Sequence, residues 1–276
     1  MMNLITRLAL LSSSVWVVVL AGPSKPELSL RINSDSFDKG LGLGLLEPTV
    51  KWQTSGSLAD CDVQGGLEMS VTEETSMPYK LWGKVKKTVG GIGLSTRVDT
   101  SSSNLNALGL DVQATKGATN LQIKGKADTG DASVSVNTVK VKQTLPALGG
   151  SLTLIPKYNL PAKKADVTVS YSTGGTVFTV DADASKQKVT IQQPLPETIG
   201  GSVAPSITTE GDITLSYSRP VGSGVVSATY KPNDFATVTY NDGPWSATVK
   251  APMDSFGSDY KDRLSFSVGR SDVIGL

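Results

Sequence analysis

The sequence predicts an all-β protein, an antiparallel meander or sandwich of quasi-repeated modules of about 50 residues. Closure of this meander into a barrel is an alternative. Three observations predict this class. Beyond residue 46, apolar and polar residues alternate with a period of two, and no stretch follows the helical period of about 3.6. The connections between these runs are short and rich in Gly, Asn, Asp and Pro. Two short sequence markers also recur in the same order.

The first marker begins with Lys-Val and leads in each copy to a glycine pair. Its copies are 84–88, 140–144 and 188–192, and the pairs are Gly90-Gly91, Gly149-Gly150 and Gly200-Gly201. The second marker begins with Asp followed by Val or Ile, at 111–115, 166–171 and 212–217, with a worn copy at 262–268. Recurrence of this kind indicates that one supersecondary unit has been multiplied, which predicts architecture rather than chemistry.

The chain divides into three parts. Residues 1–22 have the pattern of a secretory signal peptide, because Arg7 precedes a mostly apolar run that ends in small residues. Residues 23–47 are expected to form an N-terminal arm, although the apolar, glycine-spaced run at 40–46 also fits a first strand. Residues 48–276 are expected to form the repeated antiparallel β domain.

The clearest strands in that domain have one apolar side and one side of Thr, Ser, Lys or Asp, at 167–171, 178–182, 213–217, 247–249 and 264–268. This alternation is typical of an antiparallel sheet with one face against a core and the other in water. We therefore expect equivalent inward positions for Val112, Val167, Ile213 and Leu264. Turns are expected at 129–131, 173–175, 222–224, 231–234 and 241–243.

Two prolines interrupt otherwise strand-like segments. Pro156 and Pro205 fall at similar places after the glycine pairs. Because proline has no backbone N–H to donate to a ladder, their strands are expected to be edge strands or to be bulged.

Composition excludes several classes of function. The 276 residues contain no histidine, so Ser-His-Asp and Cys-His nucleophilic sites and His-ligated metals or haem are absent. Cys61 is the only cysteine, which excludes an intrachain disulfide. The net charge of +1 provides no basic field for nucleic acid. We expect no catalytic residues, no cofactor and no metal site, and hence a protein that is not an enzyme.

The candidate functional residues are contacts for self-assembly. Lysines recur at matched positions of the repeat, which suggests a repeated contact site, although a charged outer face that protects a sheet edge gives the same pattern. The candidate contacts are Lys84, Lys86, Lys87, Lys140, Lys142, Trp82 and Trp245.

Two functions fit these features. The first is a structural protein whose β-modules self-assemble through strand edges into a homo-oligomer, shell or scaffold. The second is a β-barrel pore, which requires a membrane, strands of about 9 to 11 residues and aromatic girdles. The alternating runs are mostly about 5 to 8 residues long, which favours the scaffold.

Several segments resemble plastid-associated all-β proteins of diatoms and related algae, and among these the pyrenoid shell family. They are 82–84, 156–160, 230–234 and 241–254. The resemblance implies a self-assembling shell around the plastid pyrenoid, while a barrel of the plastid outer envelope would share many of these motifs. It also implies delivery to the plastid through the signal peptide. No aromatic residue follows Ala21-Gly22 to begin a transit segment, so a secreted or endomembrane location is the alternative.

Overall fold

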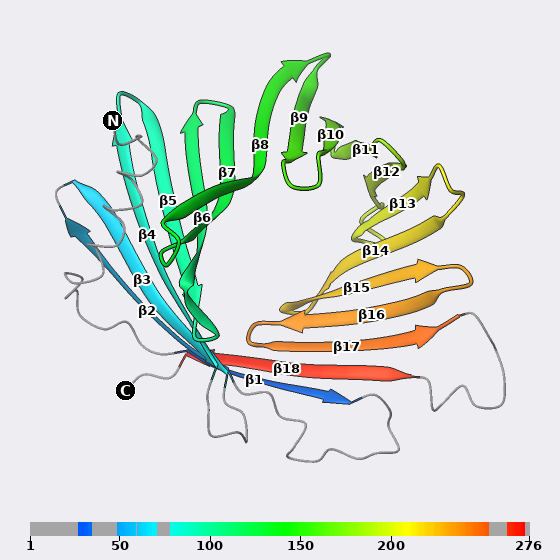
Figure 1. Ribbon diagram of the computed structural model, residues 1–276. Coiled ribbons are helices and arrows are strands. Elements are labelled where there is room, and N and C mark those ends of the chain that lie inside the picture. The colour runs from blue at the N-terminus through cyan, green and yellow to red at the C-terminus, as the bar shows by residue number, and fades with distance from the viewer. Residues whose placement is uncertain (1–26, 35–48, 59, 71–77, 254–263, 274–276) are drawn as a thin grey trace.

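The computed structural model describes residues 27–34, 49–58, 60–70, 78–253 and 264–273, and the side chains of 49–270 within those ranges (Figure 1). All regular secondary structure in them is β-strand. No helix in these ranges is long and apolar enough to cross a membrane. The predicted signal peptide, residues 1–22, lies outside the described residues.

Most of the strands are eight to eleven residues long. In chain order they are β1 (Glu27–Ser34), β2 (Thr49–Leu58), β3 (Cys61–Ser70), β4 (Tyr79–Val89), β5 (Ile92–Ser101), β6 (Asn104–Lys116), β7 (Thr119–Asp128), β8 (Ser133–Ala147), β9 (Gly150–Asn159), β10 (Lys164–Thr173), β11 (Thr176–Asp183), β12 (Gln187–Pro194), β13 (Ser202–Thr208), β14 (Ile213–Val221), β15 (Gly224–Lys231), β16 (Phe235–Asp242), β17 (Trp245–Pro252) and β18 (Ser265–Val273). The strands are longer than the runs seen in the sequence because they continue through Gly, Ala and Thr, as at Gly65 and Thr96, where the alternation is hidden.

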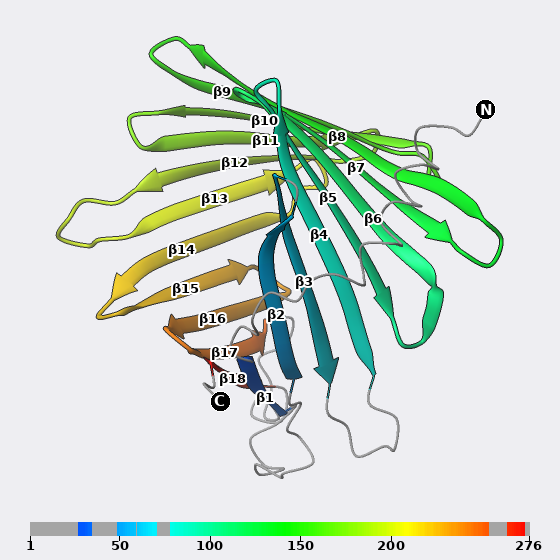
Figure 2. The same ribbon diagram turned by 90° about the vertical axis from the view of Figure 1, so that its left-hand side faces the viewer.

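The strands form one antiparallel meander that closes on itself (Figures 1 and 2). Each strand pairs with its neighbours in the chain, and β1 joins the two ends of the sheet. It pairs with β18 along its whole length and with β2 through Glu27, Leu28 and Ser29. The all-β meander is thus confirmed, with barrel-like closure rather than a sandwich. Residues 27–34, within the segment expected to be an arm, belong to the barrel.

The sequence repeat corresponds to four strands. The Lys-Val marker lies in β4, β8 and β12, and the Asp marker lies in or directly before β6, β10 and β14. The worn copy at 262–268 overlaps β18, which continues the series. The multiplied unit is therefore a pair of β-hairpins.

The two ends of the barrel differ in the length of their connections. At one end, here the short-turn end, seven connections have two residues each: 59–60, 90–91, 117–118, 148–149, 174–175, 222–223 and 243–244; the eighth, 195–201, has seven residues. Both residues have positive φ in 90–91, 148–149 and 174–175, which fits tight turns that match the strand twist. Of the repeated glycines, Gly90, Gly91 and Gly149 lie in these turns. β1 begins and β18 ends at this end. The opposite, long-loop end includes the connections 35–48, 71–78 and 253–264.

The two faces of the sheet are chemically distinct all the way round. Residues paired across neighbouring strands lie on the same face, so the registers extend one assignment from β2 to β18. Val169 pairs with Val180 and Leu154, whereas Ser170 pairs with Thr179 and Thr153. One face is therefore mainly Val, Leu, Ile and aromatic, and the other is mainly Ser, Thr, Lys and Asp.

The exposure of the side chains shows which face is concave. On a closed sheet, side chains converge on the concave side and diverge on the convex side. From β11 to β16 the apolar residues are the exposed ones, including Phe178, Ile191 and Val238, while Thr190 and Thr214 are half-buried and Ser206 is only 8% exposed. The apolar face is thus convex and the polar face is concave.

This arrangement reverses the predicted inward positions. Val112, Val167 and Ile213 are equivalent, as expected, but they lie on the convex face and are 37%, 36% and 53% exposed. Leu264 precedes β18 and is half-buried. The prediction was wrong because it assumed a packed core. Among the described side chains, the buried hydrophobic ones are only Val63, Val98 and Ala127.

Pro156 and Pro205 are in neither edge nor bulged strands, contrary to the prediction. Pro156 pairs with Val167 of β10, but the ladder to β8 lacks positions 155 and 156 and resumes in the same register. The β12–β13 ladder is interrupted in the same way at Pro205. A closed sheet therefore accommodates each proline by losing local pairing on one side.

Candidate pore-lining surface

The concave face of β10–β17 is lined by paired hydroxyl groups. Oxygen–oxygen distances are 3.0 Å for Ser170–Thr179, 3.4 Å for Ser218–Ser227 and 3.0 Å for Thr239–Thr248. Each hydroxyl can donate and accept, so these pairs satisfy one another and keep capacity for water. This half of the concave face is a neutral, hydrophilic wall.

The concave face of β4–β9 is basic, and we call it the basic wall. The registers place nine basic and three acidic side chains on it. The basic ones are Lys80, Lys84, Lys86, Arg97, Lys124, Lys126, Lys140, Lys142 and Lys157, and the acidic ones are Asp99, Asp111 and Asp128.

Glycines make room for the charged groups in the middle of this wall. The Trp82 ring lies against Gly66, where an added Cβ would be 2.6 Å from Trp82 Cε2. The Arg97 guanidinium carbon is 4.6 Å from the centroid of the same ring, a cation–π contact. Asp99 lies across Gly109, where an added Cβ would be 2.7 Å from Asp99 Oδ2. Small residues on neighbouring strands thus let larger groups lie flat along the wall.

Part of the positive charge on the wall is paired. Lys124 Nζ is 3.8 Å from Asp111 Oδ2, and the Gln122 amide donates to the same carboxylate at 2.8 Å. Lys157 Nζ is 3.0 Å from Asp166 Oδ2, which belongs to β10. A hollow of about 510 Å³ is lined by Arg97, Asp99, Asp111, Lys124 and Lys126 among others.

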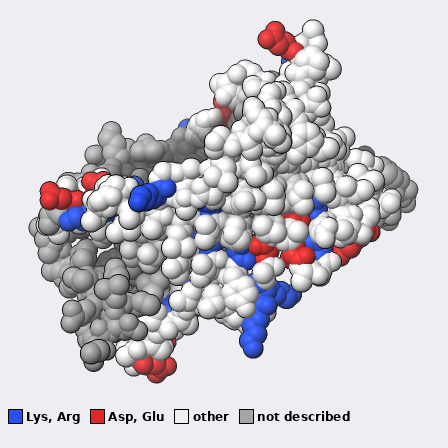
Figure 3. All heavy atoms as spheres, turned by 90° about the horizontal axis from the view of Figure 1, so that it is seen from above, with Lys and Arg blue, Asp and Glu red and all other residues white. Residues whose placement is uncertain are grey.

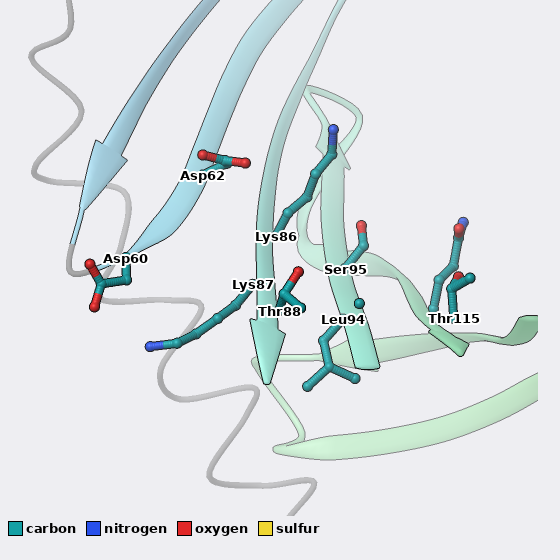
Figure 4. A pocket seen from close by; sticks show the side chains of 10 residues that line it. Asp60, Asp62, Lys86, Lys87, Thr88, Leu94, Ser95 and Thr115 are labelled. Carbon is teal, nitrogen blue, oxygen red and sulfur yellow. The ribbon is translucent and has the colours of Figure 1, made fainter. Parts of the chain in front are cut away.

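A second hollow, of about 450 Å³, lies near the short-turn end (Figure 4). Lys86 and Lys87 leave β4 on opposite sides there, with Asp60 on the side of Lys87. Ser95, Gln113 and Thr115 complete the polar lining.

The convex face from β2 to β18 is nearly free of charge. The registers place five charged side chains on its described part, Lys87, Lys116, Arg219, Asp242 and Arg270. All five lie within the four strand residues nearest the short-turn end. Seen from above, most of the surface is neither basic nor acidic, and the charged groups gather in a band and at the extremities (Figure 3).

Most aromatic residues on the convex face lie toward one end of the barrel or the other. Tyr171, Phe178, Tyr240 and Trp245 lie toward the short-turn end, Tyr79, Tyr158, Tyr230 and Phe266 lie toward the long-loop end, and Trp52 and Tyr217 lie nearer the middle of β2 and β14. The Tyr171 hydroxyl donates to the Leu148 carbonyl at 2.8 Å, and the Tyr217 hydroxyl donates to the Gly200 carbonyl at 3.3 Å. These rings therefore present an apolar body to the strands and a polar tip to the turns.

The predicted assembly contacts separate into two sets. Trp82, Lys84, Lys86, Lys140 and Lys142 lie on the concave face, so an assembly contact through them stays a prediction. Lys87 and Trp245 lie on the convex face, and the Trp245 ring is 4.8 Å from the Arg270 guanidinium carbon. Self-assembly through Lys87 and Trp245 stays a prediction.

Sequence reasoning missed Arg97, Asp99, Lys124, Lys126 and Lys157 because they lie outside the repeated marker. The alternation of the strands could have found them. Each of these charged residues stands at a polar position of its strand, next to apolar residues such as Val98 in β5 and Ile123 in β7 that belong to the other face. Among the described residues, no group of three or more Cys, Asp or Glu side chains is arranged to hold a metal ion.

No protein-family model matches the chain, and no curated protein matches it. Solved structures with a similar fold include two variants of the porin of Rhodopseudomonas blastica. One is 10% identical and the other 9%, with TM-scores of 0.46 and 0.42, and each match covers 91% of this chain and 99% of the porin. A third structure, described by the words "Asymmetric conductivity of engineered proteins", is 10% identical with a TM-score of 0.47, covering 90% of this chain and 98% of the other. These matches are too distant to carry a functional argument, so the function proposed below rests on this chain's own residues.

Proposed function

We propose that this protein is a membrane-spanning β-barrel that provides an aqueous passage for small hydrophilic solutes. The observation that carries the proposal is the closed 18-stranded sheet, whose convex face is apolar and is exposed along β11–β16, and whose concave face is polar. No step of this function is catalytic.

The number of strands supports a passage. Barrel diameter grows with strand number, and barrels of about 16 to 18 strands are too wide for side chains to fill. The scarcity of buried side chains in the described residues agrees with an unfilled interior. Ser, Thr, Lys and Asp on the concave face would remain hydrated there.

The convex face supports a lipid environment. Residues such as Phe178, Ile191, Leu215 and Val249 form a continuous apolar surface, which in water would be an aggregation hazard. In a bilayer the same surface is solvated by lipid, and β1 closes the sheet by pairing with β18 along its whole length and with β2 through three residues. The two aromatic groups fit the interfacial girdles of such barrels.

Strand length also agrees with a bilayer. A strand of ten residues, such as β9, is about 33 Å long, and at a tilt of roughly 40° it spans about 25 Å, the height of a typical lipid-facing band. One end with short turns and the other with longer loops is a further property of these barrels. The strands are longer than the alternating runs that favoured a scaffold, so strand length no longer favours it over a pore.

The rival function, a shell or scaffold, was expected to use strand edges. Every strand in the described part of the chain has a neighbour on both sides, and the shortest ladder is the three pairs between β1 and β2. The sheet therefore offers fewer free strand edges than an open one would. The resemblance to pyrenoid shell proteins stays a prediction. We propose the plastid outer envelope as the location, supported by that algal resemblance, and a fluorescent fusion of the full chain in a diatom tests it. Fluorescence outside the plastid would contradict it.

Reconstitution of the full chain tests the pore directly. We expect the protein to require detergent for refolding, to resist alkaline extraction from membranes and to raise the conductance of a planar bilayer in steps. Protein that stays soluble without detergent, forms sheets or particles and leaves the bilayer conductance unchanged would contradict the proposal. The matched inactive control is the variant Val180→Asp with Val249→Asp, which places two charges on the lipid-facing surface and should prevent insertion.

A further inference from the structure

The charge on the concave face is strongly one-sided. The basic wall of β4–β9 carries nine basic and three acidic side chains, whereas β10–β17 carry four basic and three acidic ones among their paired hydroxyl groups. The described concave side chains of β2 and β3 add one basic and two acidic groups, Lys51, Asp62 and Glu68. The excess positive charge is therefore concentrated on β4–β9 and is not spread around the lining.

Like charges also face each other across strands on this wall. Lys84 pairs directly with Arg97, and Lys140 pairs directly with Lys157. Directly opposed like charges destabilise a sheet. Arg97 is partly compensated by the Trp82 ring and Lys157 by Asp166. Among the described residues, Lys84, Lys126, Lys140 and Lys142 take part in no ion pair, so their charge remains available to a mobile anion.

From this arrangement we infer that the passage selects for anions, with the basic wall as the selecting surface; this rests on the proposed pore. Lysines on a low-dielectric wall raise the local anion concentration and lower that of cations. Small inorganic anions and carboxylate or phosphate solutes share the required chemistry. The wall of β10–β17 is nearly neutral, because its four basic side chains are offset by three acidic ones, and its hydroxyl groups can hydrate these solutes.

The distance over which the field of the basic wall acts decides how the anion selectivity depends on the salt concentration. The Debye length is about 10 Å at 0.1 M salt and about 30 Å at 0.01 M. In a wide passage the field of the wall therefore reaches the centre only at low salt. We expect the chloride-to-potassium permeability ratio to be above one at 0.1 M and to rise at least about twofold at 0.01 M.

The experiment measures the reversal potential of the full-length protein in planar bilayers under a KCl gradient. The double substitution Lys84→Glu with Lys140→Glu leaves seven basic and five acidic side chains on the wall, and should bring the permeability ratio close to one. Lys84→Arg with Lys140→Arg keeps the charge and should keep the ratio. The matched control is Lys116→Glu with Lys163→Glu, which changes the total charge equally but at a strand end and in a connecting loop.

The outcomes separate the two proposals. A conducting wild-type protein without chloride preference at low salt would overturn the inference while leaving the pore intact, as would equal effects of the wall and control substitutions. If the wall variant fails to insert, the salt dependence of the wild-type ratio still decides the question. Absence of any conductance by the wild-type protein would instead contradict the pore itself.

Discussion

Replacing Val238 by lysine discriminates most sharply between a barrel in lipid and a soluble one. Val238 is in the middle of β16 and lies on the convex face, where it pairs with Ala228 and Val249 of the neighbouring strands. The residue is 49% exposed. A lysine at the midplane of the lipid-facing surface costs about 2 to 4 kcal/mol. In water the substitution would lose only about half of a valine's burial energy, roughly 1 kcal/mol, because the lysine would be solvated.

The next residue along β16 provides the matched control. Thr239 lies on the concave face, where its hydroxyl is 3.0 Å from that of Thr248. Thr239→Lys loses that hydrogen bond, worth about 1 kcal/mol, and places the new charge where water can solvate it. Denaturant titration of both variants in lipid vesicles should show Val238→Lys to be less stable than Thr239→Lys by about 1 to 3 kcal/mol. Equal losses, or a larger loss for Thr239→Lys, would refute the assignment of the two faces.

Three further predictions concern the connections and the wall. Gly201→Ala should destabilise the barrel more than Gly174→Ala. Both glycines have positive φ, which costs alanine about 1 kcal/mol, but an added Cβ would lie 2.2 Å from the Ser218 carbonyl oxygen at Gly201 and have nothing within 4 Å at Gly174. Equal losses of unfolding free energy in the two variants would contradict this. At the long-loop end, Lys186 donates to Asp212 at 3.3 Å and pairs with Glu210, so the pKa of Asp212 lies below its usual 3.8 and that of Lys186 above its usual 10.5. The Asp212 contribution to loop order is therefore complete above pH 3.8 and lost as the pH falls through the lowered pKa, and the Lys186 contribution is lost as the pH rises through the raised one. The protection factor of the Gly211 amide, which corrects its exchange rate for the intrinsic pH dependence, should be highest between these limits, and Asp212→Asn should lower that maximum and weaken the acid-side loss. Gly66→Ala should displace the Trp82 ring from Arg97 and change tryptophan fluorescence, whereas Gly117→Ala, where an added Cβ has nothing within 4 Å, should not.

The sequence by itself determined the all-β class, five of the turns and the division of the clearest strands into two faces. Period-two alternation survives in segments such as 167–171 because each side chain must meet one of two different environments. The repeated Gly residues marked hairpin turns, because two consecutive positive φ values are strained for any residue with a Cβ. The repeat correctly indicated one multiplied unit, which is now seen to be four strands.

Only the tertiary structure decided which face is inside. Alternation is symmetric: Val167 inward with Thr168 outward gives the same sequence as the reverse. Closure through β1 breaks the symmetry, because 18 strands enclose an interior too wide to be filled by valine and leucine, so the polar face becomes concave. The basic wall likewise depends on registers that bring Lys84 opposite Arg97 and Lys140 opposite Lys157, pairs 13 and 17 residues apart along the chain. Local sequence fixes a residue's side of its strand, and only the closed sheet determines whether that side faces the lumen.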